Sequence, residues 1–173
     1  MDDVEAIKKL AHYHYEGTHG VPVDAAKATE LFRLTAERGS GHSCFVLGSI
    51  YRNGELGLDR DMAKAVKYYE MGANLGDPFC HYELGLVKGR RGSHVDAIQH
   101  FEIAAAAGLG IGVDMLIKAH QRGLLEKTDL EKSIRAKYEA WVEMQSEDRD
   151  RFIDFLKQTG HSTRGNGEHC RIV

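Results

Sequence analysis

A set of residues that returns at regular intervals constrains this chain more than any other feature. Leucines at four equivalent positions are separated by 37, 37 and 32 residues: Leu10, Leu47, Leu84 and Leu116. A small residue stands four places before each leucine: Ala6, Ser43, Cys80 and Gly112. Later in each unit come a column of alanines and a column of aromatic residues: Ala28, Ala65 and Ala97, then Phe32, Tyr69 and Phe101. Repetition of this kind predicts a solenoid in which each unit packs against its neighbours.

Within one unit, the spacing of residues predicts two helices joined by a tight turn. Small and aromatic residues recur at helical intervals and share one face: Ala65, Tyr68, Tyr69, Gly72 and Ala73. Gly54 and Gly57 lie in the segment before this helix, where a sharp turn needs backbone angles that glycine adopts readily. Asp24 and Asp61 stand at the same offset in two units, so we expect both to cap a helix N-terminus.

The motif formed by these columns resembles the Sel1-like repeat family. It reads A-x-x-x-L-G-x-x-Y-x-x-G-x-x-G, then K-A-x-x-Y-Y, then A-x-x-G, with the K-A pair at 27–28 and 64–65. The resemblance implies an all-α fold, a right-handed α-solenoid of about four helix-turn-helix repeats. The expected units are 3–40, 41–77, 78–109 and 110–145. The third has a loop shortened by five residues, and the second helix of the fourth departs from the pattern.

The C-terminal part of the chain is expected to close the array. Thr128 and Glu131 form a capping-box pattern that predicts the start of a long helix. A final helix over 146–158 is expected to act as the C-terminal cap, since the end of a solenoid must shield its core from water. The repeat domain then spans 3–158, and 159–173 form a flexible tail because they lack apolar periodicity.

Composition argues against several classes of function. The formal net charge of −3 gives no argument for binding nucleic acid or an acidic membrane. The longest uncharged apolar run, 103–113, is too short to span a bilayer. The first ten residues, MDDVEAIKKL, lack the apolar segment of a signal peptide, and three cysteines cannot form a disulfide framework. We therefore expect a cytoplasmic or nuclear protein.

No pattern in the sequence points to catalysis, a cofactor or a metal ion. The motifs GxSxG, HExxH and CxxC are all absent, as is a phosphate-binding loop. His12 and His14 are two residues apart, so on a helix they point about 200° apart and cannot share an ion. We expect a non-enzymatic scaffold, because Sel1-like repeats serve as interaction scaffolds. The alternative is an enzyme or enzyme accessory with a site between repeats.

The last four residues contain one candidate for modification. Cys170 is fourth from the end, as in a C-terminal prenylation signal. Arg171 fits that signal poorly, and Val173 is not among its usual final residues. An unmodified cysteine is therefore the preferred interpretation.

A partner-binding surface is predicted on the first helix of each unit, which lines the concave face in arrays similar to this one. In the second unit, Ser49 and Arg52 lie opposite the residues that pack inside the array. Equivalent positions become more basic along the chain, and the predicted set is Tyr15, Ser49, Arg52, Arg90, Lys118 and Arg122. A local basic stripe predicts an acidic peptide or helix as partner, because local field steers association. The alternative is an ordinary solvated helix face.

Overall fold

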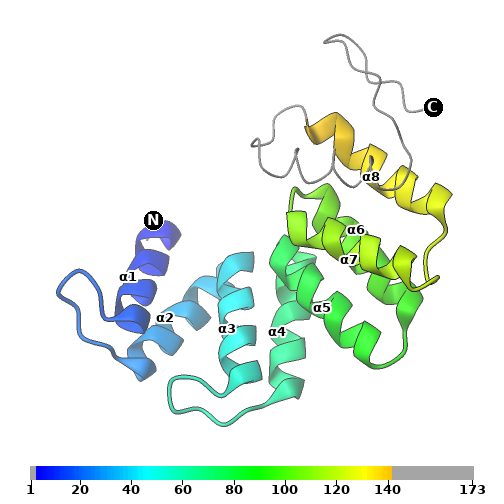
Figure 1. The fold of residues 1–173 in the computed structure, drawn as a ribbon. Helices are drawn as coiled ribbons and strands as arrows, with labels where there is room; N and C mark the ends of the chain where they lie inside the picture. The colour runs from blue at the N-terminus through cyan, green and yellow to red at the C-terminus, as the bar shows by residue number, and fades with distance from the viewer. Residues whose placement is uncertain (1–2, 142–173) are drawn as a thin grey trace.

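The computed structural model of the protein describes residues 3–141, with side chains to 134, as a succession of α-helices (Figure 1). The helices are α1 (Val4–Glu16), α2 (Ala25–Glu37), α3 (Gly41–Asn53), α4 (Met62–Asn74), α5 (Pro78–Arg90), α6 (His94–Ala106), α7 (Gly110–Gln121) and α8 (Lys127–Trp141). No strand occurs within this part of the chain. The predicted all-α fold is therefore confirmed. The expected closing helix over 146–158, the tail and Cys170 lie outside the described residues.

The helices pack in consecutive pairs that stack into a curved array (Figure 1). The tightest contacts are within the pairs α1–α2, α3–α4 and α5–α6, and the second helix of each pair contacts the first helix of the next. Helix α8 packs on both α6 and α7. Each layer thus contacts mainly its neighbours in the sequence, which is the defining property of a solenoid.

Carboxylate side chains begin several of the helices. The Oδ1 atoms of Asp24 and Asp61 accept hydrogen bonds of 2.9 Å from the backbone N–H groups of Lys27 and Lys64, so both predicted caps are confirmed. Thr128, in contrast, lies inside the first turn of α8 and does not cap it. The predicted start of a long helix is confirmed to within one residue, but Thr128 is not its cap. The backbone carbonyl of Glu126 accepts hydrogen bonds from the N–H groups of Asp129 and Leu130, so the helix begins before Thr128.

The aromatic column forms the centre of the core, and two of its rings lie over a glycine of the preceding helix. Phe32 and Tyr69 are fully buried and Phe101 almost so. A Cβ atom added to Gly48 would come within 2.3 Å of Cε1 of Tyr69, and one added to Gly85 within 2.5 Å of Cε1 of Phe101. In these two pairs the helices can therefore approach closely because the ring meets no side chain there.

The connection inside the third pair is shorter than its counterparts. Residues 17–24 and 54–61 separate the helices of the first two pairs, whereas only 91–93 separate α5 from α6. In the second pair, Leu56 and Leu58 of this connection pack against the core, and the shortened third connection has no equivalent residues. The buried residues also form two clusters, one over α1–α5 and one over α6–α8, which meet at this pair.

Two glycine-to-alanine substitutions are expected to change stability in opposite directions. Gly48→Ala should lower the free energy of unfolding by about 1–3 kcal/mol, because its methyl group would overlap the Tyr69 ring. Gly89→Ala should raise it by about 0.5–1 kcal/mol, because its methyl group would lie 3.7 Å from Cβ of Ala97 and alanine favours a helix. Urea unfolding of both variants measures the difference. Equal stability of the two would show that the ring does not determine the helix spacing.

Candidate functional site

The six residues of the predicted binding set separate into two groups in the structure. Tyr15, Ser49 and Arg52 are partly buried and make contacts within the protein. The remaining three are exposed and line one groove between α5, α6 and α7: Arg90, Lys118 and Arg122. The continuous basic stripe expected from the sequence is therefore interrupted at Arg52.

Arg52 is held in an ion pair between α3 and α5. Its Nη1 atom donates to Oε2 of Glu83, a carboxylate that is only 7% exposed. Burial opposes the charged form of Arg52, but the hydrogen bond to Glu83 raises its pKa above the ordinary value. The charge of Arg52 is neutralised by Glu83 within the protein. Exchanging Arg52 for glutamate would therefore place two carboxylates together and disturb the fold. The helical pattern of the sequence places Arg52 among the surface charges, because it does not show that Glu83, 31 residues further along, lies beside it.

Tyr15 and Ser49 belong to the same region of internal contacts. The Tyr15 hydroxyl donates to Oε2 of Glu55, and this hydrogen bond, together with burial, raises the pKa of Tyr15 to about 12. Asn53 donates to the other oxygen of Glu55 at 2.6 Å, and Nε of Arg52 donates to Asn53 at 3.2 Å. The result is a chain of polar contacts from α1 to α5. Ser49 lies beside it, with its Oγ atom 3.4 Å from the Tyr69 hydroxyl.

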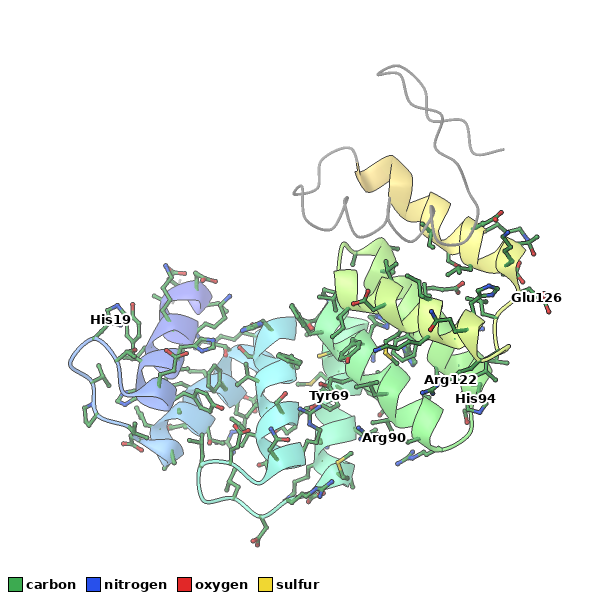
Figure 2. All side chains as sticks on the ribbon, in the orientation of Figure 1. His19, Tyr69, Arg90, His94, Arg122 and Glu126 are labelled. Atoms are coloured by element: carbon green, nitrogen blue, oxygen red, sulfur yellow. The ribbon has the colours of Figure 1, made fainter. Side chains whose placement is uncertain are left out.

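The groove lies further along the array, and its floor is apolar. It has a volume of about 330 Å³. Leu86 and Phe101 contribute to the floor from α5 and α6, and Met115 from α7. Arg90, His94 and Arg122 lie at the ends of these helices on one side of the array, as Figure 2 shows, and they line the same groove with Lys118. Leu124 is 41% exposed at its edge.

The groove lies at the junction between the first helices of two consecutive repeats, α5 and α7. The two residues that bridge the preceding junction, between α3 and α5, are replaced there. At intervals of 37 residues, Tyr15, Arg52 and Gly89 occupy one column. At the interval of 32 residues that separates Leu84 from Leu116, Met115 stands in the column of Glu83. The Arg52–Glu83 bridge thus corresponds to Gly89 and Met115, which cannot form an ion pair. Helices α3 and α5 are in contact, whereas α5 and α7 hardly touch.

The three cations of the groove form no ion pair with the described side chains. Among residues 3–134, Arg90, Lys118 and Arg122 form no ion pair, whereas the nearby Lys88 lies 3.7 Å from a carboxylate oxygen of Asp96. Three unpaired positive charges around an apolar floor create a local positive potential on a chain whose net charge is negative.

Several titratable groups with shifted pKa values lie in the core, outside the groove. Burial raises the pKa of the Cys44 thiol to about 11, and burial also raises that of Cys80 strongly, so both thiols are protonated and poor nucleophiles. Within the described side chains, no group of three or more histidine, cysteine or acidic residues is placed to hold a metal ion. No described helix is long and apolar enough to cross a membrane.

Comparison with known proteins identifies the repeat. The family model for the Sel1 repeat matches residues 4–40, 41–77 and 78–109. The chain belongs to the Sel1 repeat family. The expected fourth Sel1 unit, 110–145, lies outside the matched residues. Sel1 repeat proteins generally mediate protein–protein interactions and are typically non-catalytic scaffolds.

Similar Sel1 proteins come from bacteria and plants. A Sel1 repeat protein from Oxalobacter formigenes superposes with a TM-score of 0.66 at 24% identity, over 80% of this chain and 59% of that one. The protein c5321, a protective antigen of uropathogenic Escherichia coli with this repeat fold, gives 0.66 at 26% identity, over 91% and 34%. The ubiquitin-ligase component HRD3B of Arabidopsis thaliana is 37% identical over 83 residues, which are 47% of this chain but only 12% of that relative.

Three residues that shape this region of the Sel1 array were missed in the sequence. Glu83 is a buried partner, and Gly89 and Met115 form the gap. The signal for all three was present in the repeat columns, because Gly89 stands where the first two repeats have large polar side chains. To interpret this signal, one must know which residues face each other across neighbouring helices.

Removal of the Arg52 guanidinium is expected to destabilise the protein. Arg52→Met should lower the free energy of unfolding by about 2 kcal/mol, because the nearly buried Glu83 carboxylate loses its partner. The double variant Arg52→Met/Glu83→Met should regain most of this loss, since no buried charge is left unpaired. Urea unfolding of parent, single and double variants gives the coupling energy. A single variant as stable as the parent would contradict the structural role of Arg52.

The Tyr15 hydroxyl is expected to stabilise the protein in a pH-dependent way. The pKa of Tyr15 is raised to about 12, above the value of about 10 for an unfolded tyrosine. Its contribution is therefore fully present below pH 10 and is lost as the pH rises through 12. Tyr15→Phe should cost about 1 kcal/mol at pH 8 and progressively less above pH 10.

The control for this measurement is Tyr13→Phe, which removes a hydroxyl that forms no hydrogen bond among the described residues. Free energies of unfolding in urea are compared for both variants at each pH. A Tyr15→Phe effect that stays constant between pH 8 and 11 would contradict the role of the Glu55 hydrogen bond.

Proposed function

We propose that this protein is a non-catalytic scaffold that binds a partner protein on the concave side of its Sel1 repeats. The observation that carries the proposal is the groove between α5 and α7, where three cations without partners in the described structure surround an apolar floor. An ordinary solvated surface pairs many of its charges, as in the ion pairs Lys27–Glu30 and Lys64–Asp61. Here the charges gather around a hollow.

The chemistry of the groove favours an acidic peptide or helix. Arginine side chains such as Arg90 and Arg122 bind carboxylates with two parallel hydrogen bonds, and Lys118 adds a compact positive charge. Arginine and aromatic residues are also enriched among the few residues that supply most of the affinity at protein interfaces. Tyr15 and Arg52 have smaller roles in this proposal, because their polar groups are already bonded within the protein.

The proposed interaction takes place in the cytosol or the nucleus. Both described cysteines, Cys44 and Cys80, are unpaired, in agreement with a reducing compartment.

The proposed binding depends on salt. At physiological ionic strength, dissolved ions screen the attraction between charges beyond about 8 Å, so the groove attracts carboxylates mainly at short range. Binding should weaken as salt is added.

Reversal of the groove charges tests the proposal. The triple variant Arg90→Glu/Lys118→Glu/Arg122→Glu should lose most captured protein when full-length chains are used as bait in extracts of the native source. These residues are exposed and form no ion pair in the described structure, so the fold should be unaffected. Quantitative mass spectrometry of the captured proteins is the measurement.

A control with the same change in net charge separates the groove from the rest of the surface. Lys9→Glu/Arg33→Glu/Lys67→Glu reverses three exposed cations on α1, α2 and α4. We expect this control to capture the same proteins as the parent. Equal capture by the groove variant and the control would place the interface elsewhere on the array.

A further inference from the structure

We infer that the partner inserts one large apolar side chain into the groove at Gly89 and Met115, and that carboxylates flank this side chain. The inference rests on the proposed function and specifies the partner that the groove accepts: an acidic segment with a single apolar anchor. Three observations support the inference: the size of the groove, which is called the gap below, its apolar floor and the position of the cations.

The size of the gap suits one side chain. Its volume of about 330 Å³ is at the lower end of the range of about 300–1,000 Å³ for small-molecule pockets. An aromatic side chain buries about 150–250 Å² when it enters such a hollow, which is a large contribution from one residue. At the equivalent position of the preceding junction, the Arg52–Glu83 ion pair joins α3 to α5.

The floor of the gap is suited to an apolar anchor. Leu86, Phe101 and Met115 face it, and the aromatic ring of Phe101 is 5% exposed. Methionine is flexible and polarisable, so Met115 can adapt to an aromatic or a branched aliphatic side chain. Leu124 is 41% exposed at the edge, and an inserted side chain would cover it. Removing this apolar surface from water favours binding.

The cations lie on both sides of the gap, which defines where the carboxylates of the partner belong. Arg90 ends α5 on one side, whereas Lys118 lies in the last turn of α7 and Arg122 directly follows that helix on the other. Figure 2 shows Arg90 and Arg122. Lys118 and Arg122 are four residues apart, so they lie on one face of α7 about one turn from each other. Two carboxylates one helical turn apart on a helical partner match this spacing.

Gly89 allows the gap to be filled without disturbing the helix. A Cβ atom there would lie 3.7 Å from Cβ of Ala97, an ordinary contact, and Gly89 is in a regular helix. Gly89→Leu should therefore occupy the gap while the basic rim is unchanged. Gly89→Ala is the matched control, because it gives the same increase in helix preference and leaves most of the gap open.

Selection from a library of random dodecapeptides displayed on phage provides the test. The full-length parent is the bait, and the enriched sequences should share one aromatic or large aliphatic residue with aspartate or glutamate on both sides. A synthetic fluorescent copy of an enriched peptide should bind Gly89→Leu at least about tenfold more weakly than the parent. It should bind Gly89→Ala within about twofold of the parent, since the gap stays open.

A change in the peptide gives an independent measurement if Gly89→Leu does not fold. Replacing the shared apolar residue of the peptide with alanine should weaken binding to the parent at least about tenfold. No enrichment, enrichment without acidic residues, or binding that neither change weakens would overturn the inference.

The outcome also separates this inference from the proposed function. If the groove charge reversal abolishes capture of cellular proteins but Gly89→Leu does not, the scaffold function holds and the apolar anchor is wrong. If peptides bind in the gap as described while capture of cellular proteins is unaffected by both variants, the gap binds peptides but the native partner uses another surface.

Discussion

The structure depends on the close approach of the two helices in each repeat, which requires an aromatic ring to lie over a residue without a large side chain. Tyr69 over Gly48 and Phe101 over Gly85 leave no room for even one methyl group. Because each second helix also packs against the next first helix, this spacing determines how consecutive repeats are oriented. The regular spacing of the small and aromatic columns along this chain reflects that contact.

Polar contacts join the first helices above this core, and they vary from one junction to the next. Tyr15, Glu55, Asn53, Arg52 and Glu83 form a connected chain from α1 to α5. This series of polar contacts ends at the following junction, between α5 and α7, where Gly89 and Met115 stand in the equivalent columns. The shortened α5–α6 connection also lacks the leucines that pack on the preceding repeat. The α5–α7 junction is therefore open, whereas an ion pair bridges the α3–α5 junction before it.

In the proposed scaffold function, the open junction is the place where the protein recognises its partner. A solenoid offers a long surface, but repetition makes its repeats similar to each other, so specificity needs a place that differs. The combination of an apolar gap with Arg90, Lys118 and Arg122 is such a place. Charges steer the partner to it, and the fit of one side chain is proposed to select among acidic segments.

The sequence alone determined the helical repeat, because the core columns recur at fixed intervals and helical periodicity follows from local geometry. The Asp24 and Asp61 caps could also be predicted, because they depend only on neighbours in the chain. Only the tertiary structure decided which basic residues are free: Arg52 meets Glu83, 31 residues away, whereas Arg90 and Arg122 meet no carboxylate among the described residues. Pairing across helices depends on distances that a one-dimensional pattern does not contain.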